Sequence, residues 1–259
     1  FSYYLIKDEQ KAFPVVNSIA EIEGNTAIAV ISDLMSSERG GKGILLGGVA
    51  GITPPEIVIL GASITGSVAA RAAIGLGAMV KVFDHDINKL RKIQHYLGRQ
   101  VFTSVIHPNV LFKALASADA VIGNLRYIYG SERFMVSEEL VKTMKKGSVI
   151  VDLSVDQGGC FETSECRTIS NPVFEKHGII HYCVPNISAR VGRTSSMALS
   201  NIFTSILLKI GNSGSVKQSV ADSSGFRHGA YVFNGVMVNR LIGDYFNILS
   251  NDIGLLLAG

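Results

Sequence analysis

Cysteine is scarce in this sequence, and the three that occur, Cys160, Cys166 and Cys183, show no Cys-x-x-Cys spacing. An odd number without that spacing argues against a disulfide framework and a zinc site, and favours a cytoplasmic location. Charge is also scarce, at 17% of residues with a net charge of +3. Lysine and arginine form no basic run, so we expect no nucleic-acid partner.

Long apolar runs are missing too, although 47% of the residues are hydrophobic. The longest stretches, such as Ala27–Ile31 and Leu255–Ala258, fall far short of the roughly 20 residues that span a bilayer. We therefore expect no membrane partner. Short apolar runs divided by glycine are typical of strands buried on both faces of a parallel sheet. No EF-hand pattern or Cys/His spacing predicts a metal site.

Strand and helix patterns alternate from Glu56 onward. This alternation predicts a doubly wound parallel sheet. The expected strands lie at 57–60, 80–83, 101–105, 120–122, 148–153 and 179–184, and the expected helices at 66–76, 87–97 and 137–144.

The flanking segments have a different pattern. Residues 1–16 suggest a strand or extended segment, and a helix capped by Asn17 or Ser18 is expected to run to about Met35. A second long helix is expected to open at Thr194 or Ser195 and to run to about Ile210. The Gly- and Ser-rich stretch 211–225 predicts a loop, and a short helix is expected near 237–245.

The segment Gly61-Ala62-Ser63-Ile64-Thr65-Gly66 follows a predicted strand and opens a predicted helix. It matches the dinucleotide fingerprint in its expected context, with Ser63 in place of the second glycine. Gly61 permits the tight turn, Gly66 lets the helix pack closely on the strand, and the helix N-terminus would hold the pyrophosphate. Ser63 either crowds this site slightly or donates its hydroxyl to a phosphate oxygen.

Asp84 ends the second predicted strand, where an acid accepts hydrogen bonds from ribose hydroxyls and repels a 2′-phosphate. NAD is therefore favoured over NADP. The alternative for Asp84 is an ordinary solvent-exposed acid at the end of a strand, with no role in binding. Lys89 and Arg91 leave NADP binding as an alternative, because basic residues there could bind a 2′-phosphate. Their position on the solvent face of a predicted helix is the simpler explanation.

Several blocks together resemble the alanine dehydrogenase family and the nucleotide-binding alpha subunit of proton-translocating NAD(P) transhydrogenase. These blocks are Gly40–Val49 with the fingerprint, Asp152–Thr163 with the letters DLSVDQGGCFET, His181–Ile187 and Arg193–Leu199. The second block is closer to the alanine dehydrogenase form, because transhydrogenases lack the aspartate that matches Asp156. The similarity covers most of the chain.

The resemblance implies an α/β fold: a doubly wound parallel-sheet Rossmann domain plus part of a second α/β substrate domain. Residues 1–16 would belong to the substrate domain and 17–39 to a linking helix. Residues 40–189 would form the NAD-binding domain, and 190–259 a linking helix with the C-terminal part of the substrate domain. The chain begins with Phe1, and the family's substrate-binding Arg and Lys and catalytic His lie upstream of the matched region, so this chain is expected to lack that catalytic segment.

Family roles carry over only to matching positions. Asp156 resembles the active-site aspartate, and Asn186 and Ile187 resemble the loop against the nicotinamide. The residues expected to contact the cofactor are Gly61, Ser63, Ile64, Gly66, Asp84, Lys89, Leu125, Asn186 and Ile187.

Three positions depart from the family: Ser63, Ala20 in place of a helix serine, and the segment Gly123-Asn124-Leu125-Arg126. The charge of Arg126 puts alanine in doubt as the substrate.

The resemblance predicts NAD-dependent oxidative deamination of a small L-amino acid, with hydride transfer to NAD, in a cytoplasmic homo-oligomer that takes an amino-acid or 2-oxo-acid substrate. Two alternatives stay open: a nucleotide-binding module of a transhydrogenase, and an NAD-binding regulatory protein without turnover. Three other residues that could be chemically active are expected to have structural roles. Cys160 is expected as a buried thiol, His181 as a satisfied core residue and Asp152 as a structural hydrogen-bond acceptor.

Overall fold

The computed structural model describes residues 1–125 and 135–258. The chain divides into two compact units, one formed by Phe1–Ile19 with Arg193–Gly259 and the other by Ala20–Gly192. Within the described residues, none of the helices is both long and apolar enough to cross a membrane.

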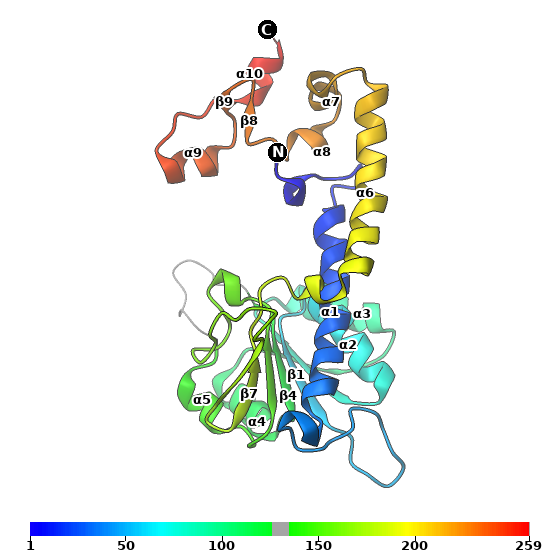
Figure 1. Ribbon diagram of the computed structural model, residues 1–259, viewed down its shortest axis with the longest axis vertical. Helices are drawn as coiled ribbons and strands as arrows, with labels where there is room; N and C mark the ends of the chain where they lie inside the picture. Colours follow the sequence, from blue (N-terminus) through cyan, green and yellow to red (C-terminus); the bar gives the residue numbers. More distant parts are fainter. Residues whose placement is uncertain (126–134, 259) are drawn as a thin grey trace. The chain divides into compact units, whose positions relative to one another are not determined.

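The larger unit is built on a seven-stranded sheet in the order β3-β2-β1-β4-β5-β7-β6 (Figure 1). The strands run parallel except for β6, which pairs antiparallel with β7. The chain moves outward from β1 to β3 and then returns to β4 on the other side of β1, which makes a topological switch point. The strands are β1 (Glu56–Leu60), β2 (Met79–Asp84), β3 (Phe102–Val105), β4 (Ala120–Gly123), β5 (Val149–Asp152), β6 (Val173–Lys176) and β7 (Ile179–Tyr182).

Helices cover both faces of this sheet. Alternate residues of a strand point to opposite faces, so Ile57 and Ile59 of β1 enter one core while Val58 and Leu60 enter the other. The first core contains α1, α2 and α3, and the second contains α4 and α5, as Figure 1 shows for the two sides of the sheet. The helices are α1 (Pro14–Leu34), α2 (Ile64–Leu76), α3 (Ile87–Leu97), α4 (Pro108–Ser117) and α5 (Glu138–Lys142), with 3₁₀ turns η2 (Ser37–Arg39), η3 (Val155–Gln157) and η4 (Ile187–Val191).

The predicted α/β alternation and doubly wound sheet are confirmed, with strand ends shifted by one or two residues. For the elements described so far, two details were wrong. α1 begins at Pro14 and not after Asn17 or Ser18, because proline at the first helical position needs no N–H partner. The edge strand β6 was not predicted, since Val173–Lys176 carries a half-exposed pattern and no long apolar run.

The smaller unit is mainly helical. For residues 1–16 a strand or an extended segment was predicted. No strand forms there: a 3₁₀ turn lies between extended backbone at Ser2 and Ile6, and α1 begins at Pro14. Ser2 N–H and Lys7 N–H donate to the carbonyls of Gly229 and Gly225 at 2.7 and 3.1 Å. The predicted loop at 211–225 is wrong, because two short helices lie there. The elements are η1 (Tyr3–Leu5), α6 (Gly192–Asn212), α7 (Val216–Asp222), α8 (Ser224–Arg227), β8 (Val232–Phe233), β9 (Val236–Met237), α9 (Arg240–Phe246) and α10 (Ile253–Ala258).

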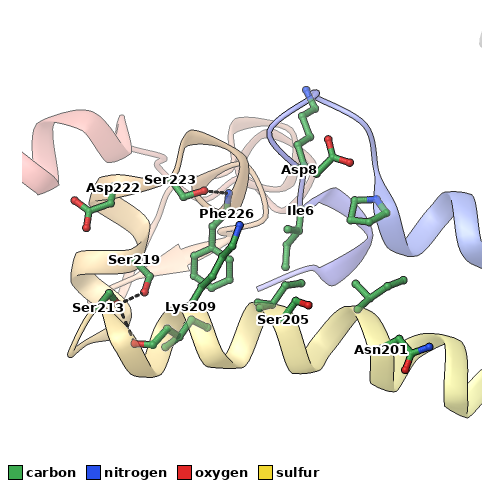
Figure 2. Close-up of a pocket in the computed structure, with 15 residues that line it drawn as sticks. Ile6, Asp8, Asn201, Ser205, Lys209, Ser213, Ser219, Asp222, Ser223 and Phe226 are labelled. Atoms are coloured by element: carbon green, nitrogen blue, oxygen red, sulfur yellow. Dashed lines mark hydrogen bonds between the residues drawn. The ribbon is translucent and has the colours of Figure 1, made fainter.

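A groove of about 570 Å³ lies within the smaller unit, between α6, residues 6–8 and the α7–α8 segment (Figure 2). Its wall is mostly apolar, with Ile6 and Phe226 facing it. Three of the serines on it make local hydrogen bonds: Ser223 Oγ caps α8 by accepting from Phe226 N–H at 3.2 Å, and the hydroxyls of Ser213 and Ser219 pair with each other. None of the residues predicted to bind cofactor or substrate lines this groove.

Candidate functional site

The turn after β1 requires glycine at two positions. Gly61 has φ +114°, a conformation that L side chains rarely adopt, and a Cβ there would lie 2.7 Å from the carbonyl oxygen of Asn124. A Cβ on Gly66 would collide with the carbonyl oxygen of Gly61. The strand, the turn and the first turn of α2 therefore pack backbone against backbone, as the fingerprint predicts.

Ser63 is the N-cap of α2. Its backbone is extended, and its Oγ accepts from Gly66 N–H at 3.4 Å. The side-chain amide of Asn124 also donates to this oxygen. The helix N-terminus beside Ser63 presents backbone N–H groups and a positive dipole end, which suit an anionic group.

Asp84 is buried, with 2% of its surface exposed, so the solvated-acid alternative does not hold. Its Oδ2 accepts from Ala62 N–H at 2.8 Å and its Oδ1 accepts from Asp86 N–H at 2.9 Å. The carboxylate thus fastens the end of β2 to the turn after β1. Each carboxylate oxygen has a second lone pair, so Asp84 can still accept from a ribose hydroxyl. Lys89 Nζ lies 3.9 Å from Oδ2 and partly offsets the negative charge.

The loop after β5 is wrapped around Asp152. This buried carboxylate accepts from Ser154 N–H at 2.9 Å, from Cys160 N–H at 2.8 Å and from Ser164 Oγ–H at 2.6 Å. Burial raises the pKa of the Asp152 carboxyl, against the lowering effect of these hydrogen bonds. The prediction that Asp152 makes structural hydrogen bonds is confirmed.

Asp156 lies on the same loop, in η3, and its side chain is exposed. It follows the carboxyl end of β5, which is the edge of the sheet where α/β folds bind ligands. The two aspartates of this loop differ in environment: Asp152 holds the loop from inside, and Asp156 is exposed to solvent at the carboxyl edge of the sheet.

Cys160 connects this loop to the end of β4. Its Sγ accepts from Leu125 N–H at 3.2 Å and donates to the Leu125 carbonyl at 3.1 Å. Burial, reinforced by the nearby Asp152 charge, raises the pKa of the Cys160 and Cys183 thiols to about 12. Raised thiol pKa values disfavour the thiolate near neutral pH. Cys160 is buried, which confirms the prediction of a buried thiol. Arg126, the unexpected charge of the sequence, lies outside the described residues.

Asn186 follows β7 in the left-handed conformation, with φ 56° and ψ 53°. Asparagine tolerates this conformation better than most residues, and Ser188 Oγ–H donates to its Oδ1 at 2.6 Å. Ile187 is only 2% exposed and packs in the core with α1 to α3, so its side chain does not face the crevice. A contact of Ile187 with a cofactor would have to use its backbone.

His181 is a satisfied core residue, as predicted. Its Nδ1–H donates to the Ile179 carbonyl at 2.9 Å, its Nε2 accepts from Thr163 Oγ–H at 2.8 Å, and its ring stacks on Phe174. Burial lowers the pKa of His181 to about 4, so the ring is neutral at pH 7.

The structure brings the ends of β1, β2, β4 and β5 together through three side-chain links: Asp84 to Ala62, Asn124 to Ser63, and Cys160 to Leu125. The sequence did not predict these links, although the amide of Asn124 directly after a strand was a signal. Ile64, at the first position of α2, is 41% exposed, and Ala20 is buried in α1. Among the described residues, no group of three or more His, Cys, Asp and Glu side chains is arranged to hold a metal ion.

The sheet order, the glycine turn and the strand-end carboxylate define a Rossmann-type α/β protein. Residues 27–240 match the family model described as alanine dehydrogenase/PNT, C-terminal domain. The chain belongs to this family. The family assignment implies NAD as the cofactor of this domain.

Individual relatives agree with this assignment. Alanine dehydrogenase of Bacillus subtilis (strain 168) is 37% identical over 233 residues, which are 90% of this chain and 61% of that protein. This chain thus spans less than two thirds of that relative's length. An L-alanine dehydrogenase structure is 31% identical with a TM-score of 0.85, over 95% of this chain and 67% of that one. A transhydrogenase structure from Sinorhizobium meliloti, 21% identical with a TM-score of 0.73 over 92% of this chain and 68% of its own, shares the fold.

Proposed function

We propose that the protein oxidatively deaminates a small L-amino acid, alanine in the first place, to the 2-oxo acid and ammonia with NAD as hydride acceptor. Membership of the alanine dehydrogenase/PNT family supports this proposal. The observation that carries it is the position of Asp156, which is exposed on the loop after β5, at the same strand edge as the glycine turn after β1.

The residues of the crevice fit NAD. Bound NAD would supply the hydride acceptor. The N-terminus of α2, with Gly61, Ser63, Ile64 and Gly66, would hold the pyrophosphate through backbone N–H groups. Asp84 would accept from the adenine ribose, with Lys89 beside it. Leu125, Asn186 and the backbone of Ile187 would border the nicotinamide end, and this last group of roles is carried over from the family resemblance.

Asp156 would act on the substrate. A carboxylate at this edge accepts a hydrogen bond from the substrate amine or from a water molecule. Its negative charge stabilises the positive charge that develops at the Cα–N bond as the hydride leaves. In this proposal the two aspartates have separate roles: Asp156 acts on the substrate, and Asp152 holds the loop. Replacing Asp156 should therefore leave the fold of the loop intact.

The Asp156→Asn variant of the full-length protein tests this role. We expect kcat and kcat/KM for alanine oxidation to fall together by roughly a hundredfold or more, because the lost interaction belongs to the transition state. NAD affinity, measured by titration calorimetry, should change by less than about twofold, since an amide of the same shape leaves the cofactor turn unaltered. The Asp86→Asn variant serves as a matched surface control.

The same assay distinguishes the alternatives. A near-normal kcat in Asp156→Asn means that Asp156 is not catalytic. NAD binding by the full-length protein without turnover of any small amino acid indicates a binding or regulatory protein. Hydride exchange between NADPH and an NAD analogue, without amino-acid oxidation, indicates a transhydrogenase module.

Three finer points belong to the proposal. Phe1–Ile19 with Arg193–Gly259 would be part of the substrate-binding domain, and α1 and α6 would be the connections to the Rossmann domain. The protein would form a homo-oligomer, which the highly exposed Leu241, Tyr245 and Leu249 support and light scattering measures. The buried free thiols Cys160 and Cys183 are compatible with a reducing cytoplasm.

A further inference from the structure

Ser63 and Asn124 form a side-chain link across the switch point of the sheet. Ser63 lies between β1 and α2, and Asn124 follows β4 directly, so the link spans two neighbouring strands. The Asn124 backbone is fixed as well, because its N–H donates to the Leu60 carbonyl at 2.8 Å. Both side chains are half-buried and lie at the carboxyl edge of the sheet, where a Rossmann fold binds its dinucleotide.

The Ser63 hydroxyl accepts hydrogen bonds in this structure, but its own proton is not donated to any described residue. A hydroxyl has one proton and two acceptor lone pairs. Gly66 N–H and the Asn124 amide donate to the oxygen, so both lone pairs are occupied. Within residues 1–125 and 135–258, no acceptor receives the hydroxyl proton. The hydroxyl proton is therefore available to an acceptor at the N-terminus of α2.

We infer that Ser63 is a side-chain donor to the pyrophosphate of the bound dinucleotide and that Asn124 is the residue that positions it. This inference rests on the proposed NAD site and deepens it. Glycine at this position allows the phosphate to approach the backbone. Ser63 adds a Cβ there, and its hydroxyl donor replaces the contact that the Cβ hinders. Asn124 makes this possible because its amide N–H fills the second lone pair and fixes the rotamer.

A series of ligands that differ in phosphate content tests the donor role. We expect Ser63→Ala to weaken NAD and ADP-ribose by about tenfold or more, the loss of one hydrogen bond to a charged group. Adenosine, which has no phosphate, should bind within about twofold of its affinity for the unaltered protein. The Ser137→Ala variant is the matched control, because Ser137 caps α5 with the same 3.4 Å bond and lies outside the site.

Asn124→Ala tests the positioning role without removing a helix cap. We expect a weaker effect, about threefold on NAD affinity, because the hydroxyl remains but loses its fixed rotamer. The double variant should bind NAD no more weakly than Ser63→Ala alone, since Asn124 acts only through Ser63. Additive losses would show that Asn124 contacts the cofactor by itself or that the pair is not coupled.

The outcomes separate this inference from the proposed function. If the unaltered protein does not bind NAD, the proposed function fails. If it binds NAD and Ser63→Ala binds equally well, only the inference is overturned. An equal loss for adenosine and NAD in Ser63→Ala would mean that the serine merely supports the turn, and would also overturn it.

Discussion

At the scale of single residues, Asp84 combines two tasks in one carboxylate. It holds the glycine turn through Ala62 N–H, and in the proposed cofactor site its charge would distinguish NAD from NADP. Because the side chain is buried, its charge acts on a bound ribose with little screening. Lys89, at 3.9 Å, is the only cation paired with it in the described part of the chain.

We expect Asp84→Asn to weaken NAD binding by roughly 1.5–3 kcal/mol for each hydrogen bond to the charged group that is lost. NADP binding should suffer less, because removal of the carboxylate also removes its repulsion of the 2′-phosphate. Titration calorimetry with both cofactors measures the two effects. Asp86→Asn is the control, since an asparagine caps α3 as well as an aspartate does. Tighter binding of NADP than of NAD by the unaltered protein would contradict the assignment.

The sequence predicted those site residues whose role depends only on their neighbours along the chain. Gly61 and Gly66 follow from the turn geometry, and the burial of His181 follows from its place inside an apolar strand. The links from Ser63 to Asn124 and from Cys160 to Leu125 join residues 61 and 35 positions apart. Such links depend on which strands become neighbours, and one sequence does not give side-chain rotamers across a sheet.

At the scale of elements, the packing of α2 on β1 depends on the absence of a single Cβ. We expect Gly66→Ala to lower the free energy of unfolding by about 3 kcal/mol or more, because the methyl group would collide with the Gly61 carbonyl oxygen. Gly75→Ala is the matched control: it lies exposed on the same helix with open space around it.

That control should raise the free energy of unfolding by about 0.5–1 kcal/mol, since alanine loses less backbone entropy in a helix than glycine. Urea denaturation followed by circular dichroism measures both variants. A tolerated Gly66→Ala together with unchanged NAD binding would show that the close approach of turn and helix is not required.

The β6–β7 edge contains a histidine whose titration is linked to stability. The pKa of His181 is about 4 in the folded protein, below the value of 6.5 for a free side chain. The unfolded chain therefore binds more protons between these values. The contribution of His181 to stability is complete above pH 6.5 and is lost as the pH falls toward 4, by an amount on the order of 3 kcal/mol.

A His181→Gln variant isolates this effect from the other groups that titrate. The variant should be less stable at pH 7, but its free energy of unfolding should fall less steeply than that of the unaltered protein from pH 6.5 to 4. Above pH 7 the two curves should run parallel, which is the internal control. Equal slopes across the acidic window would show that His181 is not held neutral by burial.

Helix starts were the least predictable elements. Asn17 and Ser18 are residue types that often cap helices, yet α1 begins at Pro14. In the Gly- and Ser-rich stretch, Ser215 and Ser223 are N-caps of real helices, each accepting a backbone N–H. The same residue types favour loops and caps, so composition alone does not separate the two. Packing against α6 and residues 1–7 determines that this stretch forms helices and not a loop.

At the scale of the whole molecule, the two units differ in how far the sequence determined them. The larger unit repeats a strand and a helix around one sheet, and its periodicity and glycine turn agree with each other. The smaller unit joins residues 1–19 to residues 193–259, so its contacts link distant parts of the chain. Its short helices and two-residue strands have weak periodicity, and their arrangement could not be inferred from local patterns.

The division into units also predicts where NAD acts. All residues proposed to contact the cofactor lie in Ala20–Gly192. We expect NAD to slow amide hydrogen exchange in the turn after β1, in the first turn of α2 and in the loop after β5, because a bound ligand suppresses local opening. Amides of α7 to α10 should exchange at the same rate with and without NAD, and adenosine, which lacks the pyrophosphate, should protect the β1 turn less. Exchange measured by mass spectrometry on peptides from the complete chain resolves these segments. Equal protection of α7 to α10 and of the β1 turn would place cofactor contacts in both units and would overturn a cofactor site confined to the Rossmann unit.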